Sequence, residues 1–246
     1  MGSDLISVMS YNICGYNFDL GPKGFPVSIR DEKVSQLKQM LMTYAPNFVG
    51  LQEDYKYIDT DESEQARKAV FSPVWRFTNG TTETTLRAKY VALAGSYALE
   101  RFSTGRFYAR AVFNYTPAHK LILFVSCHPS AYIGGEENRK AEYMELFQMI
   151  QDEVWDECIV TGDFNTNTDK DRKLLCDLCE QNGFDMAIGR YMPWLATCLG
   201  HDGTEQYSFD NILVSSGLTI RKTMVLTDWY DRLYSDHVPV FCEVML

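Results

Sequence analysis

Short apolar runs alternate with longer stretches of helical spacing along the chain, which predicts a mixture of strands and helices. Strands are typically about 4–8 apolar residues bounded by turn residues, whereas helices repeat their apolar residues every three or four positions. Strands are therefore expected at 5–12, 47–53, 90–99, 107–115, 121–128, 158–161, 209–214 and 238–244. Helices are expected at 31–45, 62–70, 136–154 and 170–181.

Two of these helices carry more specific signals. In the helix at 136–154, four apolar residues are expected to share one face: Ala141, Met144, Phe147 and Ile150. The helix at 170–181 is followed by Gly183, at a position that favours a left-handed cap.

Several neighbouring strands are joined too tightly for a crossover helix to fit between them. The strands at 107–115 and 121–128, for example, are separated only by a turn at Pro117. Parallel strands need a long connection, so the sheets should contain both parallel and antiparallel pairs. With helices covering the sheets, the expected fold is a layered α/β or α+β sandwich. No repeat or linker divides the chain, so a single domain over residues 1–246 is expected.

Composition narrows the possible partners. Of the 246 residues, 46% are hydrophobic and 13% aromatic, which is enough for a packed core. The formal net charge of −10 disfavours a broad basic face that would grip long duplex DNA. A phosphorylated substrate remains compatible with this charge, because a local cation or a bound metal can reverse the potential inside a cleft.

The cysteines and the apolar runs bear on the compartment. Seven cysteines without a framework spacing favour a reducing environment with buried thiols. No apolar run is long enough to span a bilayer, so no transmembrane segment is predicted. The first residues also lack the pattern of a secretory signal peptide, in which a charged stretch is followed by a longer apolar one. A cytoplasmic location is favoured, and secretion stays open if a signal peptide has been removed.

Polar residues able to bind metal or transfer protons stand at the ends of most predicted strands. They are Asn12, Glu53, His128, Asp163, Asn165, Asp210, Asp236 and His237. Taken singly, each has a plainer explanation: Asp163 and Asn165 could form an Asx turn, and Glu53 could be a solvated neighbour of Asp54. Together they favour a shared site, because strand ends on one rim of a sheet can gather around one cleft.

Six short segments at these strand ends resemble, in order, those of the endonuclease/exonuclease/phosphatase superfamily, whose fold is DNase I-like. They are Ser10-Tyr-Asn12, Leu51-Gln-Glu53, Ser126-Cys-His128, Gly162-Asp-Phe-Asn165, Phe209-Asp-Asn-Ile212 and Ser235-Asp-His237. The resemblance spans nearly the whole chain. It implies a four-layer sandwich of two mixed β-sheets flanked by helices, and a metal-dependent phosphoric ester hydrolase.

The resemblance also implies roles for these residues. Glu53 would be the principal Mg²⁺ ligand, with Asn12 close by, and Asp236 would support the site or contact a metal; Mn²⁺ is a possible substitute. His237, oriented by Asp210, would act as the base or electrostatic partner for the attacking water. Asp163 would contact that water, and the division of base duty between Asp163 and His237 stays open.

Other residues would form hydrogen bonds with the phosphate oxygens. Asn165 and His128 would donate hydrogen bonds to the non-bridging oxygens as the phosphorus becomes five-coordinate. No covalent intermediate is needed, so water would attack directly and in line.

The expected substrate is a compact phosphodiester or phosphomonoester: a small molecule, a lipid head group or a short nucleic acid. A DNA or RNA nuclease is the alternative, and a non-catalytic binding module on the same fold is a weaker one. The complete set of predicted site residues argues against the binding module. A monomer is expected, and no protein partner is implied.

Four further residues are candidates for substrate binding. Arg106, Tyr108 and Arg110 would share one face of a strand and present two guanidinium groups and a ring to a phosphate or a base. A solvated strand face is the competing interpretation. Trp194 could form an aromatic wall ahead of Asp210, and core packing explains it equally well.

Overall fold

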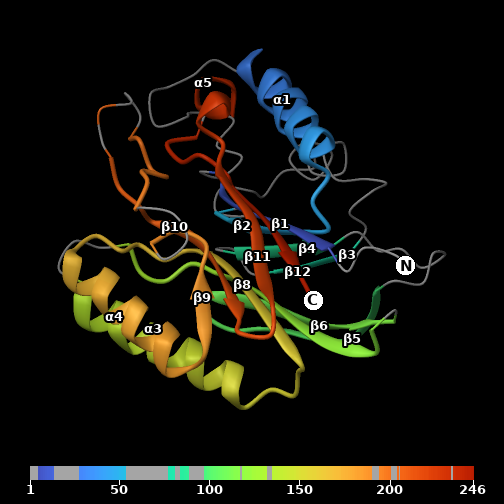
Figure 1. Cartoon of the computed structure of the whole chain (residues 1–246). Helices are drawn as coiled ribbons and strands as arrows, with labels where there is room; N and C mark the ends of the chain where they lie inside the picture. The colour runs from blue at the N-terminus through green and yellow to red at the C-terminus, as the bar shows by residue number, and fades with distance from the viewer. Residues whose placement is uncertain are drawn as a thin grey trace.

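Two six-stranded β-sheets pack face to face, and helices cover both outer sides (Figure 1). This four-layer sandwich of mixed sheets is the architecture that the family resemblance implied, and it agrees with the layered sandwich expected from the strand and helix pattern. The structure, a computed structural model, describes residues 5–13, 28–53, 77–80, 84–88, 97–116, 118–131, 135–189, 194–200, 204, 206–233 and 235–246.

The first sheet has the order β11-β12-β1-β2-β4-β3. Its strands are β11 (Thr219–Val225), β12 (Val240–Met245), β1 (Leu5–Asn12), β2 (Phe48–Gln52), β4 (Thr84–Ala88) and β3 (Phe77–Gly80). The second sheet has the order β5-β6-β7-β8-β10-β9. Its strands are β5 (Tyr97–Thr104), β6 (Tyr108–Tyr115), β7 (Lys120–Cys127), β8 (Glu157–Asp163), β10 (Asp210–Ser215) and β9 (Phe184–Met186).

The helices form the two outer layers. Helix α1 (Ser28–Tyr44) packs on the outer face of the first sheet, on the same side as the short η1 (Thr227–Trp229) and α5 (Tyr230–Leu233). Helices α3 (Glu136–Gln151) and α4 (Asp169–Gln181) cover the outer face of the second sheet. In the part of the chain that the structure describes, none of the helices combines the length and the apolar character needed to cross a membrane.

The inner faces of the two sheets come unusually close near the middle of β2. A Cβ placed on Gly50 would lie 1.8 Å from Oγ1 of Thr161 in β8, so only glycine fits there. Nearby, the ring of Phe48 packs 4.8 Å from that of Phe124, measured between centroids. This close approach holds the ends of β1 and β2 beside those of β7 and β8.

The central pair of each sheet is parallel, and this decides where the polar strand ends meet. Strands β1 and β2 run parallel with Asn12 beside Gln52, and β7 and β8 run parallel with Cys127 beside Gly162. Parallel neighbours end at the same sheet edge, where ligand sites of α/β proteins commonly lie. Four of the predicted site residues therefore reach one rim of the sandwich: Asn12, Glu53, His128 and Asp163.

The buried face of α3 differs from the one predicted. Phe147 and Ile150 are buried, but Ala141 and Met144 are exposed. The buried side instead contains the charged residues Arg139 and Glu142. Apolar spacing failed to identify this face because ion pairing allows charged side chains to be buried.

Arg139 joins three segments next to the polar rim. Its guanidinium group is fully buried and donates to both carboxylate oxygens of Asp171 in α4, at 3.2 and 3.0 Å. It also donates to the carbonyl oxygen of Ser130, two residues after His128. Asp171 in turn closes the capping box of α4 with Thr168. Arg139 thus ties α3 and α4 to the segment that follows β7.

We expect Arg139→Met to lower the free energy of unfolding by about 3–5 kcal/mol, because it leaves the Asp171 carboxylate buried without its cation. Chemical denaturation with circular dichroism measures this change. Lys173→Met is the matched control, since it breaks the exposed pair of Lys173 with Asp177 in α4 and should change stability little. Equal losses of stability in the two variants would contradict a stabilising role for the buried pair of Arg139 and Asp171.

Other elements differ from the predicted ones, and four of the described strands were not predicted: β3, β4, β9 and β11. Strand β11 was missed because an exposed strand with Arg221 and Lys222 lacks an apolar run. The strand expected at 90–99 corresponds in part to β5, and residues 89–96 lie outside the described residues. The helix expected at 62–70 lies outside them as well. Gly183 has a φ of +70°, as the predicted left-handed cap requires.

Candidate active site

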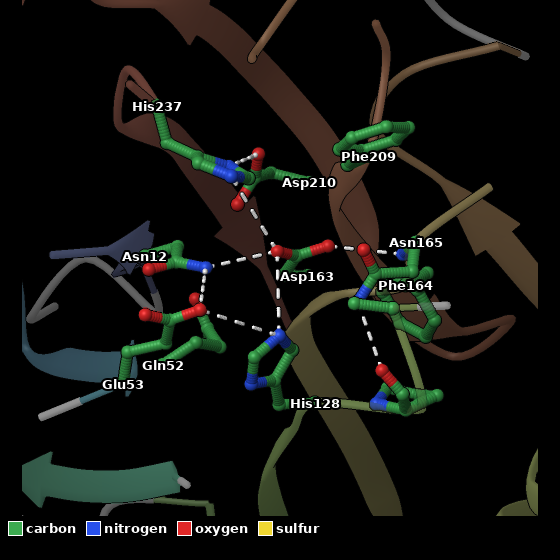
Figure 2. A network of polar contacts seen from close by, with 12 residues as sticks. Asn12, Gln52, Glu53, His128, Asp163, Phe164, Asn165, Phe209, Asp210 and His237 are labelled. Atoms are coloured by element: carbon green, nitrogen blue, oxygen red, sulfur yellow. Dashed lines mark hydrogen bonds and ion pairs between the residues drawn. The ribbon is translucent and has the colours of Figure 1, made fainter. Parts of the chain in front are cut away.

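A cavity of about 520 Å³ opens at the rim where the strand ends of the two sheets meet. The following residues predicted to be catalytic or to bind metal line it: Asn12, Glu53, His128, Asp163, Asn165, Asp236 and His237. Asp210 lies directly behind His237 and bonds to its ring (Figure 2). The structure thus brings together residues that are up to 225 positions apart in the sequence, from Asn12 to His237 (237 − 12 = 225).

Asp163 occupies the middle of this group. Its Oδ2 accepts a hydrogen bond from Nδ2 of Asn12 at 2.9 Å. The Nε2 atoms of His128 and of His237 each lie 3.6 Å from the same oxygen, on two sides (Figure 2). The side chain is almost completely buried. One carboxylate oxygen is therefore within reach of an amide from the first sheet and two imidazoles.

His237 and Asp210 form a buried pair, with 2.7 Å between Nδ1 and Oδ2. Thr197 steadies the pair from behind, because its Oγ1 accepts a hydrogen bond from the backbone N–H of Asp210. Burial raises the pKa of Asp210 to about 6, although the charge of His237 acts in the opposite direction. Burial alone would lower the pKa of His237, but the charges of Asp210 and Asp163 outweigh it and raise that pKa well above its ordinary value.

Glu53 stands at the end of β2 with a left-handed backbone, φ +58°. A non-glycine residue adopts this conformation at a cost, and such strain is common at functional sites. Its Oε1 lies 3.5 Å from Nδ2 of Asn12 and 4.0 Å from Nε2 of His128. The turn thus aims the Glu53 carboxylate into the cavity, beside Asn12 (Figure 2).

This end of the cavity fits a magnesium ion by the chemistry of its donors. Mg²⁺ takes oxygen ligands, needs only one or two carboxylates and keeps several waters. Glu53 provides the carboxylate, Asn12 adds an amide oxygen, and the cavity leaves room for water. In addition, Oε1 of the neighbouring Gln52 is buried with no hydrogen-bond partner among the described residues.

Asn165 also has a left-handed backbone, with φ +50°. Its N–H donates to Oδ1 of Asp163 at 2.9 Å, so the predicted Asx-type turn is present. Its side-chain amide donates to the carbonyl oxygen of Pro129 at 2.8 Å, which fixes the amide at the cavity wall next to His128. Asn165 therefore both forms the Asx-type turn and lines the cavity.

Sequence reasoning missed an apolar wall of the cavity, formed by Cys198, Tyr207 and Phe209. The rings of Tyr207 and Phe209 are stacked, with 5.0 Å between centroids and 10° between planes. Phe209 also lies 6.1 Å from the His237 ring. Its position directly before Asp210 was a usable signal, whereas Cys198 is 39 residues from His237 in sequence (237 − 198 = 39) and offered none.

The four predicted substrate-binding residues do not line this cavity. Arg106 precedes β6 rather than lying within it, and it pairs with Glu142 at 2.8 Å. Arg110 pairs with Glu153 at 3.1 Å and donates to Ser103. Trp194 packs against the core, and Tyr108 contacts Phe107. Internal partners hold both arginines, so the expected shared face of two guanidinium groups does not form at the site.

Comparisons with known proteins place the fold. No family model matches the sequence, and no curated protein matches it. Among solved structures, an endonuclease/exonuclease/phosphatase from Bacteroides vulgatus is 16% identical over 98% of this chain and 99% of that one, with a TM-score of 0.76. D. rerio TDP2 complexed with single strand DNA product is 15% identical over 98% and 99%, with a TM-score of 0.72.

A mannosyl-6-phosphatase from Bacteroides thetaiotaomicron is 17% identical over 98% of this chain and 100% of that one, with a TM-score of 0.70. At such identities the similarity establishes the fold. The chain thus has the DNase I-like fold of the endonuclease/exonuclease/phosphatase proteins, as its sequence segments predicted.

Proposed function

We propose that this chain is a Mg²⁺-dependent hydrolase that cleaves phosphate ester bonds by direct attack of water. The observation that carries the proposal is the convergence on Asp163 of polar strand ends from both sheets, inside one cavity. Shared fold with phosphatases and with a DNA-processing protein supports the same reaction class.

In this proposal Asp163 orients the attacking water and accepts its proton. The raised pKa of His237 favours the imidazolium at neutral pH, and an imidazolium cannot act as the base. His237 instead stabilises negative charge on the phosphate, held in place by Asp210. In the proposal His128 and Asn165, which also line the cavity, donate hydrogen bonds to the other phosphate oxygens.

Glu53 and Asn12 would hold the magnesium ion, beside Asp163 and away from its contact with His237 (Figure 2). When bound, the ion would neutralise a phosphate oxygen and stabilise charge on the leaving oxygen. Asn12 also donates to Asp163, so it links the metal end of the cavity to the residue that contacts water.

The cavity favours a compact phosphodiester or phosphomonoester. Its volume of about 520 Å³ is in the usual range for small-molecule sites. The stacked rings of Tyr207 and Phe209 offer a surface for an apolar or planar part of the substrate. Because bases stack readily on aromatic side chains, cleavage of short single-stranded nucleic acid is the second candidate.

A substrate panel tests the proposal. Generic phosphomonoesters, phosphodiesters, short single-stranded DNA and RNA, and phospholipids are incubated with Mg²⁺, with Mn²⁺ or with EDTA. We expect turnover of at least one compact ester with Mg²⁺, and its loss both in EDTA and in Asp163→Asn. No turnover of any member, or equal turnover in Asp163→Asn, would overturn the proposal. Preference for the oligonucleotides would select the second candidate.

A further inference from the structure

Three short segments place Tyr207, Cys198 and His237 side by side on one face of a small ladder. Cys198 and Tyr207 exchange two backbone hydrogen bonds, each of 2.9 Å. Cys198 also lies opposite His237, but the backbones of these two residues do not bond to each other. Instead the backbone N–H of Leu199 donates to the carbonyl oxygen of Asp236, and that of Val238 donates to the carbonyl oxygen of Thr197. This is the non-hydrogen-bonded type of antiparallel pair, in which opposite side chains approach most closely.

The ladder brings three metal-binding groups together at the cavity wall. The sulfur of Cys198, a carboxylate oxygen of Asp236 and a ring nitrogen of His237 all lie within 4.8 Å of one another. Cys198 and His237 are buried, Asp236 is partly exposed, and all three line the cavity. In a tetrahedral zinc site with ligands at about 2.0–2.3 Å, neighbouring ligand atoms are roughly 3.5 Å apart. Binding of an ion would therefore bring the three ligand atoms from within 4.8 Å of one another to this closer spacing.

The surroundings of His237 add an independent feature of zinc sites. Nδ1 is held by the Asp210 carboxylate at 2.7 Å, so a metal ion would bind at Nε2 and displace the proton that Nε2 carries in the imidazolium. A histidine that binds zinc usually donates its other ring N–H to a carboxylate or a carbonyl, which fixes the ring and raises its basicity. Here that partner is already in place, and it is itself fixed by Thr197.

We propose that Cys198, Asp236 and His237 form a second metal site, selective for zinc, whose occupation inhibits the enzyme. Three protein ligands leave the fourth tetrahedral position to water. The thiolate distinguishes the site from the oxygen-rich end at Glu53 and Asn12, because sulfur ligands select Zn²⁺ over Mg²⁺. Zinc would take Nε2 of His237 away from the phosphate. The inhibition rests on the proposed hydrolysis, whereas the binding of zinc does not.

Metal binding is measured first, on the purified full chain without substrate. Co²⁺ replaces zinc as a coloured probe, and a thiolate-to-cobalt absorption band reports a sulfur ligand; Zn²⁺ affinity follows from competition. We expect the band in the native chain and its absence in Cys198→Ser. Zn²⁺ affinity should fall by about tenfold or more in Cys198→Ser, since a hydroxyl is a far weaker ligand than a thiolate. The same fall in Zn²⁺ affinity is expected in Asp236→Asn. This variant keeps the thiol, and it tests the site if Cys198→Ser fails to fold.

Cys176→Ser is the matched control, because Cys176 is a partly buried thiol on α4 that does not line the cavity. It should keep both the absorption band and the affinity for Zn²⁺. A band that persists in Cys198→Ser, or disappears in Cys176→Ser, would overturn the site.

Inhibition is measured second, as the Zn²⁺ concentration that halves each variant's own rate at fixed Mg²⁺. We expect this concentration to rise about tenfold or more in Cys198→Ser and to be unchanged in Cys176→Ser. Inhibition that excess Mg²⁺ relieves equally in all variants would place zinc at Glu53 instead and overturn the inhibitory role. Cobalt binding through Cys198 without turnover of any ester would refute the proposed hydrolysis while the metal site stands.

Discussion

Replacing His237 with alanine is expected to lower kcat by about two to four orders of magnitude while leaving the fold intact. The imidazole is buried between Asp210 and Asp163. Its removal takes away the positive charge that, in the proposed mechanism, stabilises the phosphate. It also leaves Asp210 without its partner. Steady-state kinetics on the best ester from the panel measures the loss, and circular dichroism confirms folding.

The pH profile separates this role from a merely structural one. Because the pKa of His237 is raised, activity should persist into the alkaline range and fall only as pH rises through that raised value. The alkaline fall should be absent in His237→Ala. On the acid side, activity should decline as pH falls through about 6, where Asp210 takes up a proton and releases its hold on the imidazole.

His119→Asn is the matched control for His237. His119 is exposed in the turn between β6 and β7 and has a φ of +53°, which asparagine tolerates better than alanine does. Its replacement should leave kcat and the pH profile unchanged. A loss of less than tenfold in His237→Ala would remove His237 from the role proposed for it.

Replacing Glu53 with glutamine is expected to abolish stimulation by Mg²⁺. The change keeps the size of the side chain and its left-handed backbone, but it removes the carboxylate charge at the end of β2. Magnesium binds through few protein carboxylates, so the loss of one removes most of the affinity. Rates measured across a Mg²⁺ titration, with calorimetry of Mg²⁺ binding to the free chain, give two independent measurements.

Glu100→Gln, at an exposed carboxylate in β5 of the other sheet, is the control and should retain the whole Mg²⁺ response. If Glu53→Gln keeps full stimulation and the native affinity, the metal is not held at this end of the cavity. If affinity is lost but turnover is not, Glu53 binds an ion that the reaction does not require.

The candidate active-site residues could be identified from local sequence. Asn12, Glu53, His128 and Asp163 stand where an apolar strand ends, whereas Asp210 begins β10 and His237 precedes β12. An apolar run that stops at Asn12 or Asp163 can be recognised without knowing its neighbours. The mixed sheets could also be predicted from local sequence, because a short connection between two strands allows only an antiparallel pair. The polar edge strand β11 could not, because its stability comes from pairing with β12 rather than from its own composition.

Contacts with long-range partners could not be predicted. Arg106 and Arg110 were expected to face substrate together, but they lie outside the cavity and pair with Glu142 and Glu153, which are distant in sequence. Arg139 and Glu142 were not assigned to the buried face of the helix, yet they lie on the buried side of α3. Arg139 donates a hydrogen bond to Asp171, and Glu142 accepts one from Ser130. A charge pattern along a helix cannot reveal a partner supplied by another element.

The amino-acid sequence by itself determined which side chains could carry chemistry and that they would stand at strand ends. Only the tertiary structure decided that two imidazoles and an amide would meet at one oxygen of Asp163, and that Cys198 would lie opposite His237. The physical reason is that strand formation follows from residues next to one another. The distances within the cavity depend instead on sheet packing across Gly50 and on backbone pairing between segments far apart in the chain.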